Sequence, residues 1–229
     1  SKTFITNGGS ADLICLAAKT DPKQGSKGIS LLMIETDDLE GFRRGKPLKK
    51  VGMKGNDTAE LFFENVKIPQ TNLLGSEEGK GFYQLMKQLP WERLYIGIAG
   101  LGAADCALEE TLKYVKERKA FGQRVFDFQN TKFKLAELKT KTEVTRSFIN
   151  DCIQKLVAGD LDAATASMAK YWGSQIQGEI LDECVQLHGG YGFMAEYPVA
   201  RMWTDARVQK IYGGTNEIMK ELIARSLDD

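Results

Sequence analysis

One glutamate in the sequence stands where apolar residues dominate. Glu92 lies in the segment Leu-Pro-Trp-Glu-Arg-Leu at positions 89–94. With about 100° between successive helical residues, its neighbours on the same face would be Leu85, Leu89, Ile96, Ala99 and Ala103. A carboxylate on such a face loses water and takes up a proton more readily, which is the property of a general base that works near neutral pH. Glu92 is therefore a candidate catalytic base.

Two structural interpretations of Glu92 compete with catalysis. Pro90 can break the helix, and residues before and after it would then no longer share one helical face. However, Ile96, Ala99 and Ala103 follow this proline and still share one face with Glu92. Alternatively, Glu92 is buried against an arginine for stability alone. The helical pattern by itself leaves all three interpretations open.

Two glycine-rich breaks are candidates for ligand binding. The segment Gln186 to Gly192 ends a helical pattern in glycines, where backbone amides can approach a ligand closely. In the segment Ile211 to Glu217, two glycines precede Thr215, a predicted N-cap, and the free amides of a helix N-terminus suit an anion. Each break taken alone is more often an ordinary helix end.

Other polar residues carry weaker signals. His188 is the sole histidine, so it predicts neither a catalytic triad nor a metal site, and its default interpretation is structural. Arg118 and Phe121 end a helical pattern, with Gln129 further along. An arginine at a helix C-terminus compensates the helix dipole, and this simpler interpretation is favoured without further context.

Composition excludes several classes of protein. The 229 residues carry 31 basic and 31 acidic side chains, so no net field draws the chain to nucleic acid or to an anionic membrane. No apolar run approaches the roughly 20 residues of a membrane span. The four cysteines are widely spread without a C-x-x-C pair, which argues against a zinc site and favours a reducing compartment. The opening Ser-Lys-Thr-Phe-Ile-Thr lacks an initiator Met and predicts a fragment or a processed product.

The elements that must position these residues fall into two groups. Short apolar runs separated by turn residues predict antiparallel strands of a sandwich or barrel, at 4–6, 13–18, 29–34 and 61–68. From residue 79 the period is helical, over 79–118, 127–157, 161–187, 196–209 and 215–226. The predicted fold is α+β, with residues 1–73 as the remainder of a β-domain and residues 74–229 as an all-α helical bundle. The predicted bundle core includes Leu85, Leu89, Ile96, Leu135, Leu138 and Leu187.

Taken in order, these motifs resemble the acyl-CoA dehydrogenase family across essentially the whole chain. The resemblance rests on six segments, at 4–7, 52–61, 118–122, 186–192, 196–198 and 211–217. It is nearest the long-chain branch, followed by the isovaleryl-type enzymes. It implies the C-terminal two-thirds of a flavoprotein, in which the end of a β-domain precedes the helical domain.

The resemblance implies α,β-dehydrogenation of acyl-CoA thioesters, with a glutamate removing the α-proton and the β-hydrogen leaving as hydride to FAD. Most members carry that glutamate where this chain has Gly213. In the long-chain and isovaleryl branches it comes instead from a Glu-Arg-Leu motif of the first long helix. That motif is Glu92-Arg93-Leu94 here. Because the glycine and the motif occur together, the resemblance identifies Glu92 as the base.

The resemblance also implies the rest of the site, without a metal. The implied FAD contacts are Phe4, Ile5, Thr6, Arg118, Phe121, Gln129, Gln186, Leu187, His188, Gly189, Gly190, Thr215, Asn216 and Glu217. Of these, Arg118 and Gln129 would reach the FAD of a neighbouring subunit. The implied substrate contacts are Arg93, Tyr114, Tyr212, Gly213 and Gly214.

The implied partners are an acyl-CoA substrate, an electron-transfer flavoprotein and three further copies of the chain in a dimer of dimers. Bacterial cytoplasm and mitochondrial matrix both fit as the location. Two alternatives remain: an acyl-CoA oxidase or another flavoenzyme on the same fold, and a non-catalytic helical assembly module. The presence of Glu92 weighs against the second.

Overall fold

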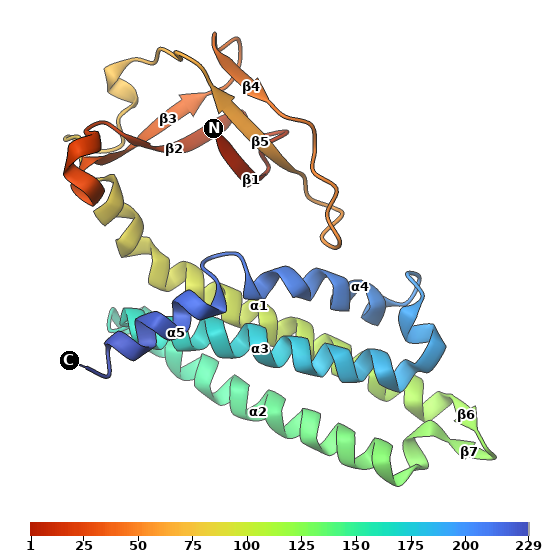
Figure 1. Cartoon of the computed structure of the whole chain (residues 1–229). Coiled ribbons are helices and arrows are strands. Elements are labelled where there is room, and N and C mark those ends of the chain that lie inside the picture. The colour runs from red at the N-terminus through yellow and green to blue at the C-terminus, as the bar shows by residue number, and fades with distance from the viewer. Residues whose placement is uncertain (229) are drawn as a thin grey trace. The chain divides into compact units, whose positions relative to one another are not determined.

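The computed structural model describes residues 1–228 and has the predicted α+β architecture, with strands in the first part of the chain and helices in the second (Figure 1). By compactness the chain divides into two units, of which the first is Ser1–Gln88 and the second begins at Leu89.

The first unit is built from two antiparallel pieces of sheet. One contains β1 (Lys2–Thr6), β5 (Thr58–Phe63) and β4 (Phe42–Arg44) in the order β1-β5-β4. The other is the hairpin of β2 (Leu13–Lys19) and β3 (Ile29–Glu35), with Leu16 opposite Leu32. Apolar residues from both pieces are buried: Leu31, Ile34, Ala59 and Leu61.

The strand prediction was wrong in two places. The strand expected at 61–68 is β5, which begins at Thr58 and ends at Phe63. The chain turns after Phe63 because Asn65 adopts a positive φ of 52° and the amide of Glu64 donates to the carbonyl of Gly41. Strand β4 was not predicted, since three residues next to charged neighbours give too short an apolar signal.

Five helices follow, and their ends lie close to the predicted ones. They are α1 (Gly81–Glu117), α2 (Gln129–Ala158), α3 (Ala163–His188), α4 (Pro198–Ala206) and α5 (Asn216–Arg225). After α4 the chain continues as a 3-10 helix, Arg207–Lys210, where a longer α-helix was predicted. Gly159, in a left-handed conformation at φ 84°, ends α2, and Asp162 caps α3 by accepting from the amide of Thr165. Pro90 lies inside α1 and does not end it.

Helix α3 is the centre of the second unit and contacts α2, α4 and α5 (Figure 1). The predicted core residues Ile96, Leu135 and Leu138 are buried there, and Leu187 is half-buried against the same cluster. Leu89 is half-buried. The prediction for Leu85 was wrong, because its side chain is exposed.

Helices α1 and α3 approach each other at glycines. A Cβ atom on Gly97 would lie 2.6 Å from the carbonyl oxygen of Ala169, and one on Gly173 would lie 2.7 Å from the Cα of Gly97. Both distances are shorter than a side chain tolerates, so neither position accepts a larger residue without a shift of the backbone. The two helix backbones are therefore in direct contact at this crossing.

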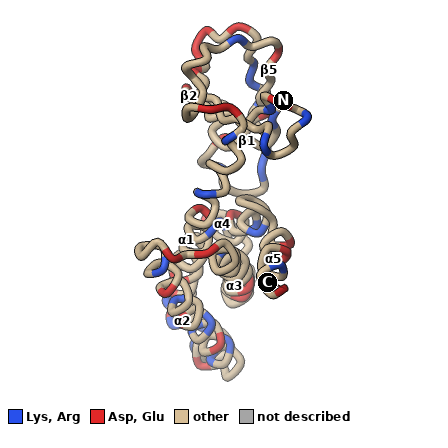
Figure 2. The backbone as a smooth tube through the Cα atoms, turned by 90° about the vertical axis from the view of Figure 1, so that its left-hand side faces the viewer, with Lys and Arg blue, Asp and Glu red and all other residues tan. Residues whose placement is uncertain are grey.

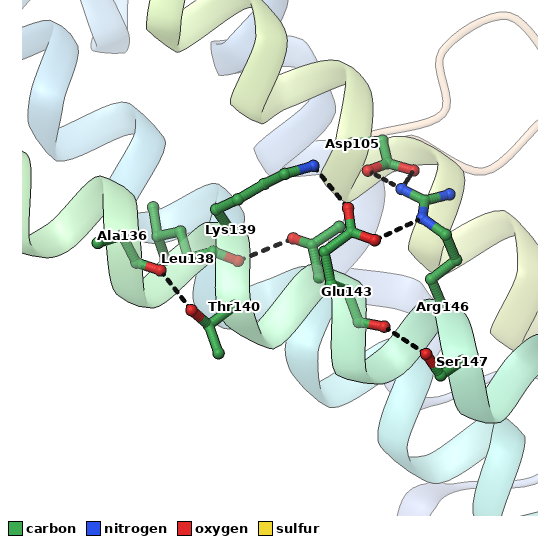
Figure 3. A network of polar contacts seen from close by, with 9 residues as sticks. Asp105, Ala136, Leu138, Lys139, Thr140, Glu143, Arg146 and Ser147 are labelled. Atoms are coloured by element: carbon green, nitrogen blue, oxygen red, sulfur yellow. Dashed lines mark hydrogen bonds and ion pairs between the residues drawn. The ribbon is translucent and has the colours of Figure 1, made fainter.

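Charged residues of both signs are spread along the outside of the helices, as Figure 2 shows for α2. One ion-pair network joins α2 to α1 (Figure 3). The guanidinium of Arg146 contacts both carboxylate oxygens of Asp105, with Nη2 to Oδ2 at 2.6 Å, and also contacts Glu143. Glu143 in turn pairs with Lys139 one turn earlier on α2. The network fixes the register of α2 on α1.

Candidate active and cofactor sites

Glu92 lies on α1, and its side chain is exposed to solvent. The prediction that its carboxylate loses water was therefore wrong for the chain alone. The physical reason is the phase of the helix. The face of α1 that packs against α3 carries Arg93, Gly97 and Gly100, and Glu92 is rotated from the middle of that face by roughly 110° at 100° per residue. Within the described residues, no hydrogen bond or ion pair engages the Glu92 carboxylate, so it is available to a ligand.

The neighbours of Glu92 on α1 divide into an exposed and a buried set. Trp91 and Tyr95 are exposed and their rings stack, with centroids 5.8 Å apart. Arg93 is buried, and its Nη1 lies 3.5 Å from the hydroxyl oxygen of Ser167 on α3. Burial lowers the pKa of Arg93, an effect opposed by the negative charge of Glu92. The buried place of Arg93 gives no support to its predicted contact with CoA, which stays a prediction.

The loop before α5 packs against α1 one turn beyond Glu92. A Cβ on Gly213 would lie 2.3 Å from Cδ1 of Ile96. Burial raises the pKa of the neighbouring Tyr212, with a further contribution from Tyr95. Gly213 and Gly214 have φ values of 64° and 92°, a region that favours glycine. The structure thus brings the predicted thioester loop and the segment of the predicted base together.

The N-terminus of α5 is capped as predicted. The hydroxyl oxygen of Thr215 accepts from the amide of Ile218 at 3.4 Å. The backbone amide of Glu217 and the Thr215 hydroxyl lower the pKa of the Glu217 carboxyl. Asn216 is buried, and its amide nitrogen has no partner among the described residues. This helix start presents one orphaned side-chain donor, the amide nitrogen of Asn216.

A second group of predicted residues lines one cavity of about 480 Å³. Its walls include Tyr114, Arg118, Gln186, Leu187, His188, Gly189 and Gly190. Gly189 has a positive φ of 59°, and a Cβ on either glycine would meet nothing within 4 Å, so the backbone is open to a ligand there. The cavity combines an arginine, an aromatic ring and accessible backbone, which suits an anionic or heteroaromatic ligand.

His188 holds the floor of this cavity and is structural in its contacts. Its Nδ1 lies 2.8 Å from the carbonyl oxygen of Cys184, so Nδ1 carries the proton and donates. Its ring stacks on Tyr114 at 4.3 Å, and the Tyr114 hydroxyl donates to the His188 carbonyl at 3.1 Å. Burial lowers the pKa of His188. A neutral imidazole therefore packs under the ligand-facing residues.

The remaining predicted contacts lie on exposed turns. Phe121 occupies the tip of the hairpin β6 (Lys119–Ala120) and β7 (Gln123–Arg124), which was not predicted. Its side chain is 96% exposed and its φ is 51°. Such an exposed aromatic in a strained conformation fits a contact outside the chain itself. Gln129 is exposed at the start of α2.

In the first unit, Phe4, Ile5 and Thr6 form the end of β1. Phe4 has a positive φ of 58° and is 77% exposed. The pairing of β1 with β5 is irregular between Lys2 and Ile5, which turns the Phe4 ring away from the ladder. Observed backbone strain of this kind is enriched at functional sites.

The sequence reasoning missed a buried polar cluster on α3. Lys170, Ser167 and Ser174 are each 0% exposed. The available signal was a lysine among small and apolar residues at helical spacing, at positions 166, 169, 173 and 176. Within the described residues, no group of three His, Cys, Asp or Glu side chains could hold a metal ion. The helices of residues 1–228 include none that is both long and apolar enough to cross a membrane.

Comparison with protein families gives two consecutive matches. Residues 1–66 match the middle domain of acyl-CoA dehydrogenase, and residues 79–227 match its C-terminal domain. The chain belongs to the acyl-CoA dehydrogenase family.

Similar proteins span several branches of the acyl-CoA dehydrogenase family. The mitochondrial long-chain specific acyl-CoA dehydrogenase of Rattus norvegicus is 54% identical over 229 residues, which cover 99% of this chain and 53% of that protein. The caffeyl-CoA reductase-Etf complex subunit CarC of Acetobacterium woodii is 40% identical, over 99% of this chain and 59% of that protein. An acyl-CoA dehydrogenase structure from Geobacillus kaustophilus has a TM-score of 0.96 and 51% identity, covering 99% of this chain and 60% of that one. The chain thus spans little more than half the length of these family members.

Proposed function

We propose that this chain is part of an FAD-dependent enzyme that dehydrogenates acyl-CoA thioesters between Cα and Cβ. The observation that carries the proposal is the meeting of Gly213 with Ile96, one turn after Glu92. Position 213 holds no carboxylate, while a free one stands on the adjacent helix. Membership of the acyl-CoA dehydrogenase family supports the reaction class.

In this proposal, Glu92 is the base. Its carboxylate accepts the α-proton, the electron pair of the Cα–H bond forms the double bond, and the β-hydrogen leaves with its own pair. Bound FAD supplies the acceptor for that hydride. Ile96, Tyr212 and Gly213 lie beside this segment of α1, and Ile96 occupies the space into which a side chain at position 213 would project.

The residues fit FAD on two observations of the structure. The 480 Å³ cavity exposes the backbone of Gly189 and Gly190 beside Arg118, and the start of α5 holds the orphaned amide nitrogen of Asn216. We propose Gln186 to Gly190 and Thr215 to Glu217 as FAD contacts. Phe4 to Thr6 would contact the flavin, Phe121 would be a further FAD contact, and Arg118 and Gln129 would contact the FAD of a neighbouring copy.

The proposal extends to the domains, the assembly, the substrate and the location of the whole protein. We propose residues 1–73 and 74–229 as the two domains, a homotetramer as the assembly, long-chain or branched acyl-CoA as substrate, and bacterial cytoplasm or mitochondrial matrix as the location. The 54% identity to the rat long-chain protein supports the chain-length class. The relative named as part of an Etf complex supports an electron-transfer flavoprotein as electron acceptor.

The decisive experiment uses the full-length protein with FAD and the variant Glu92→Gln. Anaerobic stopped-flow absorbance follows flavin reduction by acyl-CoA substrates of different length. Loss of a positioned base is expected to slow reduction by about 10²–10⁴-fold, while FAD content and binding of a product analogue are kept. Glu109→Gln, at another exposed position on α1, is the matched control. A Glu92→Gln enzyme that reduces flavin at the wild-type rate would show that another group takes the proton.

A further inference from the structure

Lys170 is a buried cation without a carboxylate partner. Its side chain on α3 is 0% exposed, and its Nζ donates to Oδ1 of Asn216 at 2.8 Å. Ser174, also on α3, donates its hydroxyl to the same oxygen at 3.1 Å. Among the residues described, no ion pair involves Lys170. A buried charge that is held only by neutral acceptors destabilises the fold, so its retention calls for a role.

A second cation lies behind the same helix start. Arg93 on α1 is 8% exposed, its Nε has no partner within the described chain, and its nearest acceptor is the hydroxyl of Ser167. The positive charge of Arg93 contributes to lowering the pKa of Lys170. The hydrogen bond from Lys170 to the Asn216 side chain thus connects these buried cations to α5.

Asn216 is well placed to anchor the loop before it. It is the first residue of α5, directly after the N-cap Thr215. The two residues before Thr215 are Gly213 and Gly214, and both have a positive φ. Glycine has the greatest backbone freedom of any residue type. A loop of this composition needs an external anchor to keep one conformation, and the Asn216 carbonyl oxygen has two donors from α3.

We propose that Lys170 is a positioning residue, which through Asn216 fixes the Gly213–Gly214 loop and the start of α5 on α3. That this loop faces the thioester and FAD rests on the function proposed above. The anchor itself rests only on contacts within this chain.

The anchor responds to pH because Lys170 titrates in an accessible range. Burial is the largest effect and lowers its pKa to about 8. Of the charged groups that face it, Glu217 on α5 raises this pKa and Arg93 on α1 lowers it. Lys170 is therefore charged below this value and loses its charge above it. The loop is expected to sense the change through Asn216.

Nuclear magnetic resonance on the 229-residue chain tests the proposal without any cofactor. The backbone amide shifts of Gly213 and Gly214 are followed between about pH 6.5 and 9.5. In the wild type both are expected to titrate with a midpoint near 8. Lys170→Met removes the charge in a side chain of similar length and is expected to abolish this titration. Lys220→Met, which removes an exposed lysine from α5, is the matched control and is expected to keep it.

Hydrogen exchange separates positioning from stability. In Lys170→Met, the protection of the first hydrogen-bonded amides of α5, beginning with Met219, is expected to fall about tenfold, as for loss of one hydrogen bond from a charged donor. Protection at Leu181 in the middle of α3 is expected to stay. The core variant Ile180→Val is expected to lower thermal stability while leaving the glycine titration intact.

Two further variants keep the test decisive if Lys170→Met folds poorly. Lys170→Gln retains a donor but no charge and is expected to lose the titration as well. The double variant Lys170→Met/Asn216→Leu removes both polar partners and is expected to recover thermal stability but neither the titration nor the protection of α5. Glycine shifts that titrate unchanged in the Met and Gln variants would overturn the proposal. Because no flavin is involved, this result is independent of the Glu92→Gln experiment.

Discussion

A Cβ atom on Gly213 would lie 2.3 Å from Cδ1 of Ile96, which follows Glu92 by one turn of α1. The loop at position 213 and the helix that carries the proposed base therefore share one small volume. Ile96 fills the space into which a side chain at 213 would project. The positive φ of 64° at Gly213 adds backbone strain for any other residue.

The first prediction concerns moving the base to position 213. In the full-length Glu92→Gln enzyme, Gly213→Glu alone is expected to restore little flavin reduction, because its side chain meets Ile96 and its backbone is strained by about 1–2 kcal/mol. Adding Ile96→Ala provides the space and is expected to return part of the activity, with an altered preference for chain length. Stopped-flow flavin reduction measures both.

The control for relocation is Gly213→Gln in the same Ile96→Ala background, which has the shape of the new side chain without its basicity. Equal activity of the Gln and Glu versions would mean that the cavity, not the carboxylate, is responsible. Full recovery by Gly213→Glu without any change at Ile96 would contradict the steric argument.

The second prediction is that the isolated 229-residue chain binds FAD weakly or not at all and shows no turnover. The chain spans 53% of the rat relative, and Phe121, a proposed FAD contact, is 96% exposed when the chain is alone. A site with part of its contacts missing loses the preorganisation on which affinity depends. The flavin-to-protein ratio after desalting is the measurement, with the full-length protein as the control. A yellow, stoichiometrically loaded chain would refute this.

The third prediction is a pH dependence of stability due to His188. Because burial lowers its pKa, the unfolded chain binds a proton more readily than the folded chain as the pH falls through the ordinary histidine range of about 6.5. The stability contributed by neutral His188 is present above that range and is lost as the pH falls through it. His188→Asn keeps a donor for the Cys184 carbonyl but does not titrate, so its melting temperature is expected to fall less between pH 7 and 5. Parallel curves for the two proteins would exclude this role.

The fourth prediction concerns the tie between α1 and α2. Arg146→Met removes the contact of Nη2 with both carboxylate oxygens of Asp105 and is expected to destabilise the fold by about 1 kcal/mol, since the pair is partly exposed. The loss is expected to shrink at high salt. Urea unfolding at two salt concentrations measures it, and Arg225→Met, which breaks a more exposed pair with Glu221, is the matched control. A loss at Arg146 no larger than at Arg225 would show that the network is inert.

Sequence reasoning located the helices well and the burial of α1 poorly. Helix ends were marked by local signals such as Gly159 and Thr215, which act within one turn and are readable in the sequence. The face of α1 was misjudged because the wheel counted Leu85 and Leu89 as core. The true packing face is defined by Gly97 and Gly100, whose lack of a side chain allows the close approach of α3.

The residues of the candidate site were predicted from the sequence, but the buried polar side chains behind them were not. The helical periodicity predicted a buried Glu92 and did not predict that Arg93 is buried. In the structure Glu92 is exposed and Arg93 is buried. Lys170 was missed because a lysine on an α-helix is ordinarily solvated. Its partner Asn216 lies 46 residues away in the sequence, and only the fold brings the two together.

The glycine crossing of α1 and α3 also limits how the molecule can move. Where Gly97 meets Gly173, no rotamer can change and no void can close, so the contact has no side-chain adjustment with which to absorb a displacement. A tilt of one helix is therefore expected to move the other helix with it. Glu92 lies five residues before this crossing on α1, and Lys170 lies three residues before it on α3. We therefore expect the Cα atoms of Glu92 and Lys170 to keep a nearly constant separation during thermal motion, because both lie close to this backbone contact.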